Sequence, residues 1–588
     1  MRNDTWMGRR AALHERFLAV ARLGDASRLA YINGPLTVWT EEEVAALWRR
    51  ALDAPVSALE PRNSIYVHVP FCKSICHFCN YDRLQPSSPE LLQTWLGRVL
   101  RSVQVIAPAV RPLTFHALYI GGGTPSVLPA RLLRELLDTL DAAFSWHPGA
   151  SRLLEFDPAV INRERLEVLA THGFQRLSFG IETLDAEVNV RHNRGRQGLE
   201  TIERVFADLD AVGISEVACD FLLGLEGTTP EGILAEMETV IRRFRPVVVD
   251  IFMVTPTQAY VDSHFGGQWE AFRAHLACFE AVVPPALPAL AARTGYFVRA
   301  GHGHHMSLGL YDPAGGSNRS SKPNKGGRAR REILAGCSYT ALSSDARCPV
   351  NVIGLGRSAR SVIFATAAFS ARDPDDNPAV EGPANYIGNA IDVADEARTF
   401  LVHRLRDNNT VGRTEFRQIF GGDMTEIIPT ALRAWEHEGT AHLEDDVLRF
   451  VPQNKHARMR SLLWLVPDEA LDFELAHYAG LELSPSGVAR LVAPLKPGTR
   501  LAGGYTFAGA DGIFLLLRTP EDQTLRVRVA AGLTDEFPLR FVAGDIANTR
   551  DVASLRRAVG QLRGLVTYYH RQQAKPPSSR RAGTALER

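Results

Sequence analysis

Short apolar runs alternate with amphipathic helical stretches across the first half of the chain. The apolar runs have the length and composition of buried strands and cover Ile65–Val69, Ala117–Ile120, Leu153–Phe156, Arg176–Phe179, Val217–Leu222 and Val247–Phe252. The stretches between them have a helical period and include Leu132–Leu140, Arg163–Ala170, Glu200–Leu209 and Glu231–Arg242. This alternation predicts a parallel sheet with right-handed crossovers. Six such units predict an α/β fold, a partial (β/α)6 barrel, with its chemistry at the carboxyl ends of the strands.

The pattern differs on either side of this barrel segment. Residues 1–60 are amphipathic and predict an N-terminal helical arm, which serves as a lid, an oligomer contact or simple packing. Residues 395–455 predict short helices and a hairpin with an acidic turn, a small winged-helix-like module. Residues 456–573 contain two β-like runs and a last helix, and predict an extra C-terminal α+β domain of unassigned role. The tail, 574–588, is rich in polar residues and proline and predicts disorder.

The composition indicates the cellular compartment and the kinds of partner to expect. Lys plus Arg equals Asp plus Glu at 66 each, so the overall charge does not indicate nucleic-acid or membrane binding. The N-terminus lacks the apolar stretch of a signal peptide, and no uninterrupted apolar run has the length of a spanning helix. Seven cysteines is an odd number and three of them are clustered, which favours metal ligation in a reducing compartment. We therefore expect a cytoplasmic protein.

The clustered cysteines are Cys72, Cys76 and Cys79, spaced C-x3-C-x2-C directly after the first predicted strand. Three thiolates can hold three irons of a four-iron cluster, which leaves the fourth iron without a protein ligand. The alternative is a zinc site, but zinc usually takes four ligands from two cysteine pairs or from added histidines. No second pair is present, and His77 is adjacent to Cys76, which makes joint ligation awkward. The spacing therefore favours an iron–sulfur cluster.

Glycines and acids follow the later strands. The segment Gly121–Thr124 comes after the second strand, where glycine lets the backbone approach a ligand and N–H groups can meet a carboxylate. Glu155 and Asp220 end the third and fifth strands. A lone acid at the end of an apolar strand is costly unless it is paired, and such a carboxylate can accept both hydroxyls of a ribose. Glu182 closes the fourth strand in the same way.

These motifs together resemble the oxygen-independent coproporphyrinogen III oxidase (HemN-like) branch of the radical S-adenosylmethionine (SAM) enzymes. The resemblance runs from Tyr66 to about Phe369 and also includes Ser178-Phe179-Gly180, Asn193-Arg194 and Gly354-Leu355-Gly356. It implies a radical SAM catalytic domain over residues 61–394, a [4Fe-4S] cluster on the three cysteines and two SAM molecules. It also implies a flavodoxin- or ferredoxin-like electron donor, whose electron cleaves SAM to methionine and a 5′-deoxyadenosyl radical.

The resemblance assigns roles to individual residues of this chain. It places the cluster-bound SAM against the glycine segment that includes Gly121, and against Tyr66, Gly122, Glu155 and Ile363. It places the second SAM against Phe78, Gly123, Thr124, Glu182, Arg194, Asp220 and Val254. Tyr66 and Glu182 are the residues that we predict to be catalytic.

The chain departs from that branch at several positions. The oxidase has a further cysteine where this chain has Tyr81, and the branch commonly has glutamine where this chain has Glu182. An ionised carboxylate cannot donate a hydrogen bond, so recognition of the second ligand is altered. Glu226 stands where proline is usual, and the His-Asn-x-x-Tyr-Trp segment of the heme chaperones is absent around Cys337. We therefore expect the substrate-binding region to differ from those of the oxidases and the heme chaperones.

Three functions remain open on these residues. The first, which we favour, is class C methyl transfer or cyclopropanation of an unsaturated carbon on a small-molecule or carrier-bound substrate. The second is radical chemistry on a coproporphyrinogen-like tetrapyrrole. The third is a heme chaperone without turnover, and the loop with His302, His304 and His305 is a candidate for binding heme or another metal.

Overall fold

The computed structural model describes residues 2–21, 29, 37–299, 305–310, 348–471, 492 and 495–543, apart from a few single or paired positions inside these ranges. The chain forms two compact units. The barrel unit comprises Val38–Gly388 with Gln418–Gly421. The terminal unit comprises Met1–Thr37, Asn389–Arg417 and Gly422–Arg588.

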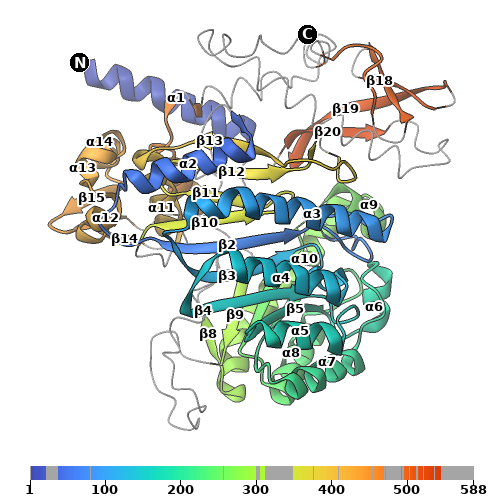
Figure 1. The fold of residues 1–588 in the computed structure, drawn as a ribbon. Helices are drawn as coiled ribbons and strands as arrows, with labels where there is room; N and C mark the ends of the chain where they lie inside the picture. The colour runs from blue at the N-terminus through green and yellow to red at the C-terminus, as the bar shows by residue number, and fades with distance from the viewer. Residues whose placement is uncertain are drawn as a thin grey trace. The chain divides into compact units, whose positions relative to one another are not determined.

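A run of parallel strands forms the centre of the barrel unit (Figure 1). The strands pair in chain order and are β2 (Arg62–Val69), β3 (Thr114–Gly122), β4 (Ser145–Phe156), β5 (Arg176–Glu182), β6 (Glu216–Leu223) and β7 (Val248–Met253). Each of the six predicted apolar runs coincides with one of these strands. The predicted α/β fold with a partial barrel is therefore confirmed.

Further strands extend this sheet beyond what the apolar runs predict. On the β2 side lie β10 (Val350–Leu355), which is parallel to β2, and then β11 (Arg360–Ile363), β12 (Ala367–Arg372), β13 (Asn385–Ala390) and β1 (Thr37–Trp39). On the β7 side lie β9 (His305–Gly309) and β8 (Phe297–Arg299), and both of these pairings are antiparallel. These strands are short, and some of them have one polar face, so they lack the continuous apolar signal of β2–β7.

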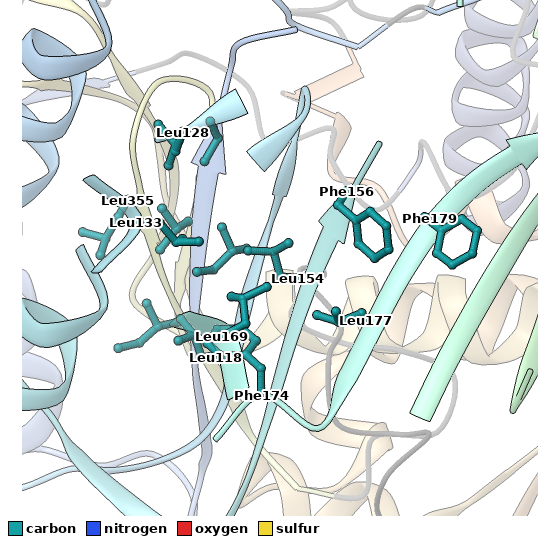
Figure 2. Packing of buried hydrophobic residues seen from close by; sticks show 14 of the residues in the cluster. Leu118, Leu128, Leu133, Leu154, Phe156, Leu169, Phe174, Leu177, Phe179 and Leu355 are labelled. Carbon is teal, nitrogen blue, oxygen red and sulfur yellow. The ribbon is translucent and has the colours of Figure 1, made fainter. Parts of the chain in front are cut away.

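Helices follow the parallel strands and cover their outer face. They are α3 (Pro89–Ile106), α4 (Ala130–Ala143), α5 (Arg163–Thr171), α6 (Ala186–Arg191), α7 (Leu199–Val212), α8 (Pro230–Phe244), α9 (Gln258–Phe265) and α10 (Trp269–Thr294), with the 3-10 turns η2 (Ala107–Val110) and η3 (Pro125–Val127). Leu133 of α4 and Leu154 of β4 are buried in the core between strands and helices, together with Phe179 of β5 (Figure 2). This core holds the strand ends in fixed positions.

Helix α2 (Glu41–Asp53) lies within the predicted N-terminal arm but is part of the barrel unit. A capping box starts it, because Glu43 N–H donates to Thr40 Oγ1 at 3.2 Å and Thr40 N–H donates to Glu43 Oε2 at 2.8 Å. Trp48 then packs into the barrel core. The buried Glu41 carboxylate accepts a hydrogen bond from Ser102 Oγ at 2.7 Å.

Among the described helices, α10 alone is long and apolar enough to cross a membrane by length and composition. It carries three internal prolines, and Phe279, Val283 and Leu287 pack in the core of the barrel. A core helix of a soluble domain passes the same test, so α10 is weak evidence for a membrane span.

The terminal unit contains two small sheets. The first is antiparallel, in the order β14 (Thr410–Gly412), β16 (Val447–Phe450), β15 (Ala441–Glu444), and the second is the antiparallel meander β17 (Thr506–Asp511), β18 (Phe514–Arg518), β19 (Thr524–Thr534), β20 (Phe537–Ala543). The helices of this region are α1 (Arg2–Ala21), α11 (Val393–Asp407), α12 (Arg413–Phe420), α13 (Met424–Ile427), α14 (Pro429–Glu438) and α15 (Lys455–Leu463). Trp435 is buried and donates to the carbonyl of Ser461 at 2.7 Å. The predicted domain boundaries stay predictions, and the tail 574–588 lies outside the described residues.

Candidate active site

The three clustered cysteines lie on the loop between β2 and α3, at the carboxyl end of the first barrel strand. Cys76 is 8% exposed, and Cys72 and Cys79 are partly buried. Burial raises the pKa of the Cys72 thiol, and it raises that of Cys76 to about 12; the nearby Cys79 adds to both shifts. The sulfurs are therefore close enough to interact electrostatically. Three sulfur donors on one short loop fit three irons of a four-iron cluster, whose binding would displace the thiol protons.

The glycine segment holds the cysteine loop directly. Gly123 N–H donates to the carbonyl of Val69 at 2.8 Å, and Thr124 N–H donates to that of Phe71 at 2.7 Å. Thr124 Oγ1 donates to Cys72 Sγ at 3.4 Å. A Cβ on Gly123 would lie 2.7 Å from the Phe71 carbonyl oxygen, so no larger residue fits. These N–H groups, which we expected to meet a ligand carboxylate, are thus used to fix the loop.

Glu155, at the end of β4, is partly buried beside the same segment. It accepts a short hydrogen bond from the Tyr119 hydroxyl and one from Gly122 N–H at 3.3 Å. A Cβ on Gly121 would lie 2.7 Å from Glu155 Oε2, which explains the glycine there. Burial raises the pKa of Glu155 although both hydrogen bonds lower it. The ring of Tyr66 lies 5.6 Å from that of Tyr119, so the predicted catalytic tyrosine adjoins the Glu155 carboxyl group.

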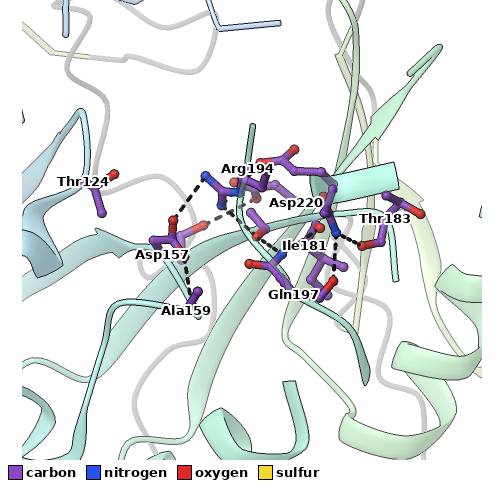
Figure 3. A network of polar contacts seen from close by, with 12 residues as sticks. Thr124, Asp157, Ala159, Ile181, Thr183, Arg194, Gln197 and Asp220 are labelled. Atoms are coloured by element: carbon purple, nitrogen blue, oxygen red, sulfur yellow. Dashed lines mark hydrogen bonds and ion pairs between the residues drawn. The ribbon is translucent and has the colours of Figure 1, made fainter. Parts of the chain in front are cut away.

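Arg194 lies among the acids of the barrel and is paired with Asp157 (Figure 3). Its guanidinium donates to the carbonyl of Gly180 at 3.0 Å and pairs with Glu182 at 3.5 Å and Asp157 at 3.7 Å. The nearby Cys76 interacts with it electrostatically and raises its pKa. Burial lowers the pKa of Arg194, but these neighbours outweigh burial and raise it, so the group stays charged.

Glu182 is held in an uncommon conformation at the end of β5. Its φ is 61°, in the left-handed region that costs energy for a residue with a side chain. Burial raises the pKa of Glu182 although Arg194 lowers it. The side chain curls over Gly180, where a Cβ would lie 2.2 Å from Glu182 Oε1. A strained, buried carboxyl group with a shifted pKa is typical of a functional site.

Asp220 on β6 completes the acidic set. Burial raises its pKa well above the ordinary value, and the carboxylates of Asp250, Glu182 and Glu155 raise it further. Ser178 Oγ donates to it at 3.4 Å. Four neighbouring strands therefore each direct one acid into a shared environment, where like charges favour the protonated form of Asp220.

The remaining predicted residues lie in apolar surroundings. Phe78 and Val254 belong to one small apolar cluster with Tyr260. Ile363 lies on β11, is 1% exposed and packs in the main core, so its side chain faces away from solvent. His302 and His304 lie outside the described residues, and of His305 only the backbone is described, paired with Phe252.

Three residues of the site were not predicted from the sequence. Tyr119 precedes Gly121 by two residues in β3, so strand periodicity places both on one face. Asp250 interrupts the apolar run of β7, which is the signal that identified Glu155 and Asp220. Asp157 follows Glu155 by two residues, and its ion pair with Arg194 joins segments far apart in sequence.

The barrel and the three-cysteine loop are similar to those of the radical SAM superfamily. The family model of that superfamily matches residues 66–240, which contain the cysteines, the glycine segment and the acids of β4–β6. The chain is also similar to HemN-like proteins of that superfamily. It is 30% identical over 179 residues to the oxygen-independent coproporphyrinogen III oxidase of Paracoccus denitrificans, covering 30% of this chain and 40% of the relative.

A second relative has a different function, and a solved structure shows similarity of the fold alone. The chain is 28% identical over 176 residues to the heme chaperone HemW of Bacillus subtilis, covering 28% of this chain and 44% of the relative. The matched segments thus span less than half of either curated relative. The solved structure of coproporphyrinogen III oxidase (HemN) from Escherichia coli covers 73% of this chain and 94% of its own, with a TM-score of 0.55 and 18% identity.

Replacing Arg194 tests its role in balancing the buried acids. We expect Arg194→Ala to lower the free energy of unfolding by about 3–5 kcal/mol, because it leaves buried carboxylates without their cation. Urea denaturation of the metal-free protein, followed by tryptophan fluorescence, measures the change. The matched control is Arg196→Ala, whose pair with Glu187 is exposed, and we expect a loss of at most about 1 kcal/mol. Equal losses in the two variants would contradict the interpretation.

The raised pKa of Asp220 predicts a pH-dependent stability. In the window above its ordinary pKa of 3.8, the folded state holds a proton that the unfolded state has released, so stability falls as pH rises. Asp220→Asn removes this pH-dependent contribution to the free energy of unfolding. We therefore expect the free energy of unfolding of the variant, relative to the parent, to increase between pH 5 and pH 8 by up to about 1.4 kcal/mol per pH unit. A constant difference across that range in urea denaturation would show that Asp220 carries no raised pKa; the surface change Asp208→Asn is the control.

Proposed function

We propose that this chain is a radical SAM enzyme that uses two SAM molecules for class C methyl transfer or cyclopropanation. Cys72, Cys76 and Cys79 would hold the [4Fe-4S] cluster, and its open iron would take the first SAM. When bound, these groups supply a 5′-deoxyadenosyl radical that activates the methyl group of the second SAM for addition to an unsaturated substrate carbon.

The observation that carries the proposal is the presence of two separate carboxyl sites in one barrel. Glu155 is held by Tyr119 and Gly122, whereas Glu182 is paired with Arg194 and neighbours Asp220. A carboxylate can accept both hydroxyls of a ribose, so each site offers the acceptor that one nucleoside needs. Two such sites support two bound SAM molecules.

The chain's own residues would perform several tasks around these ligands. Tyr119 orients the carboxyl group of Glu155, and the ring of Tyr66 packs against that of Tyr119. Arg194 keeps a positive charge between Cys76 and Glu182, which offsets the charge of cysteine thiolates. Glu182, with its raised pKa, is placed to hold or move a proton at its carboxyl oxygen near the second ligand.

The surroundings of the site support a substrate different from that of the coproporphyrinogen oxidases. Tyr81 occupies the position of their further cysteine and is 61% exposed beside the cysteine loop. We infer a small-molecule or carrier-bound substrate, a flavodoxin- or ferredoxin-like electron donor and a cytoplasmic location, without a nucleic-acid or membrane partner.

Two other functions are supported by the named relatives. Similarity to the Paracoccus oxidase favours oxidation of a coproporphyrinogen-like tetrapyrrole. Similarity to the Bacillus chaperone HemW favours heme binding without turnover. The segments that match these two relatives cover 30% and 28% of this chain, so the similarities leave most of the chain unexplained.

Removing one cysteine tests the cluster. We expect Cys76→Ala to lose nearly all bound iron and sulfide after anaerobic reconstitution, because the buried central thiol is one of only three ligands. SAM cleavage to 5′-deoxyadenosine under dithionite should fall with it. Cys278→Ala, which changes an exposed thiol on α10, is the matched control and should keep both. A full cluster in the Cys76 variant would refute the cysteine assignment.

Product analysis separates the three functions. With an unsaturated acceptor substrate, the methyl route yields 5′-deoxyadenosine and S-adenosylhomocysteine together. We expect Glu182→Gln to change the yield of S-adenosylhomocysteine more than the binding of the first SAM, because Glu182 lies at the second site. Carbon dioxide release from coproporphyrinogen without S-adenosylhomocysteine would instead establish the oxidase. Tight heme binding without substrate-coupled SAM cleavage would establish the chaperone.

A further inference from the structure

Three histidines and a glutamate gather beside the cysteine loop, outside the site described above. His77 is on that loop, His192 caps the end of α6, Glu226 follows β6 and His264 is in the last turn of α9. One ligand atom from each of His192, Glu226 and His264 lies within 4.8 Å of the other two. In Figure 1, α6 and α9 lie at the end of the barrel toward which β2 points. We call these four residues the histidine site.

His192 presents an unused nitrogen inside the protein. The side chain is fully buried, and its Nε2 lies 2.9 Å from the carbonyl oxygen of Glu226. A carbonyl only accepts, so Nε2 carries the hydrogen and Nδ1 carries a lone pair. Nδ1 is buried and has no hydrogen-bond partner in the described structure. A buried acceptor without a donor is unfavourable, and a metal ion would satisfy it.

His264 also has one ring nitrogen within hydrogen-bond distance of another group. Its Nε2 lies 2.9 Å from Nδ1 of His77, and its ring stacks on that of His192 with centroids 4.1 Å apart. Each of the two histidines therefore has one nitrogen engaged in a hydrogen bond, which is the outer contact that orients a metal-binding imidazole. Burial lowers the pKa of His192 and lowers that of His264 to about 4, so both rings are neutral, as ligation requires.

Glu226 supplies the oxygen donor and is held in place. Its Oε2 pairs with Arg191 at 3.0 Å, and its backbone N–H donates to the Tyr260 hydroxyl at 3.1 Å. The ion pair engages one carboxylate oxygen, so Oε1 can serve a metal. The Tyr260 ring also stacks on His192, with centroids 5.6 Å apart, which fixes the two donors relative to each other.

We propose that His192, Glu226 and His264 bind one divalent transition-metal ion of the zinc type. Two imidazoles and one carboxylate are a common zinc donor set, with a fourth position for water. Bonds of about 2.0–2.2 Å in a tetrahedron separate ligand atoms by roughly 3.4 Å, so small side-chain rotations bring the three donors together. Nitrogen and oxygen donors distinguish this site from the sulfur donors of the cysteine loop.

The bound metal would stabilise the cysteine loop. The backbone N–H of His77 donates to the carbonyl of His192 at 3.0 Å, and the His77 side chain bonds His264. Fixing His192 and His264 therefore fixes the residue that follows Cys76. This inference does not depend on which reaction the enzyme performs, since it requires only the residues of the histidine site.

Zinc titration of the cluster-loaded protein tests the proposal. We expect one zinc per chain, measured by calorimetry and by elemental analysis after desalting, with the iron content unchanged. His264→Asn and, separately, Glu226→Gln should each weaken zinc binding by about tenfold or more, while circular dichroism confirms folding. His147→Asn is the matched control, because His147 stacks on His116 at a different place on the barrel unit, and it should bind zinc like the parent.

Three results would overturn the proposal. The first is a parent protein that retains no zinc after desalting. The second is equal zinc affinity in the parent and in both folded variants. The third is iron that falls as zinc rises, which would place zinc at the cysteines. If the protein bound zinc but did not cleave SAM, the result would count against the proposed reaction and not against the histidine site.

Discussion

The buried charge of Arg194 is the interaction on which the site depends. Its guanidinium meets the carbonyl of Gly180, the carboxylates of Glu182 and Asp157, and the thiol of Cys76. Few side chains can serve several acceptors at once, and the planar fork of arginine does so without losing its charge. Without a cation at this point, buried carboxylates and cysteine thiolates would repel one another in a poorly solvated space.

The parallel barrel explains why so many acids meet there. The carboxyl ends of consecutive strands lie at one edge of the sheet, so one acid per strand on β4 to β7 produces a ring of like charges. Burial and mutual repulsion then raise the pKa values of Glu155, Glu182 and Asp220, and some of these groups hold protons when the protein is folded. Proton-bearing carboxyl groups can donate as well as accept hydrogen bonds, which widens the range of ligands the lumen can bind.

Sequence patterns predicted the barrel strands because each contains a short, mainly apolar run most of whose residues are buried. The same patterns identified Glu155 and Asp220, because an acid at the end of such a run stands out. They could not reveal the pairing of Arg194 with Asp157, which joins separate loops, or the left-handed backbone of Glu182. The resemblance predicted that Arg194 contacts the second ligand. That Arg194 also lies close to Cys76 is known only from the structure.

The cysteine loop is held mainly by polar contacts at successive residues. Thr124 donates a hydrogen bond to the sulfur of Cys72, and His77 is hydrogen-bonded to both His192 and His264. Arg194 interacts electrostatically with Cys76. Apolar packing contributes through Phe78, which is only partly buried. Polar contacts are directional, so they fix the sulfurs in one geometry more precisely than apolar packing would. Ligands at the carboxyl sites and a metal at the histidine site would therefore act on the same loop, because Arg194 and His77 reach it from different elements of the barrel.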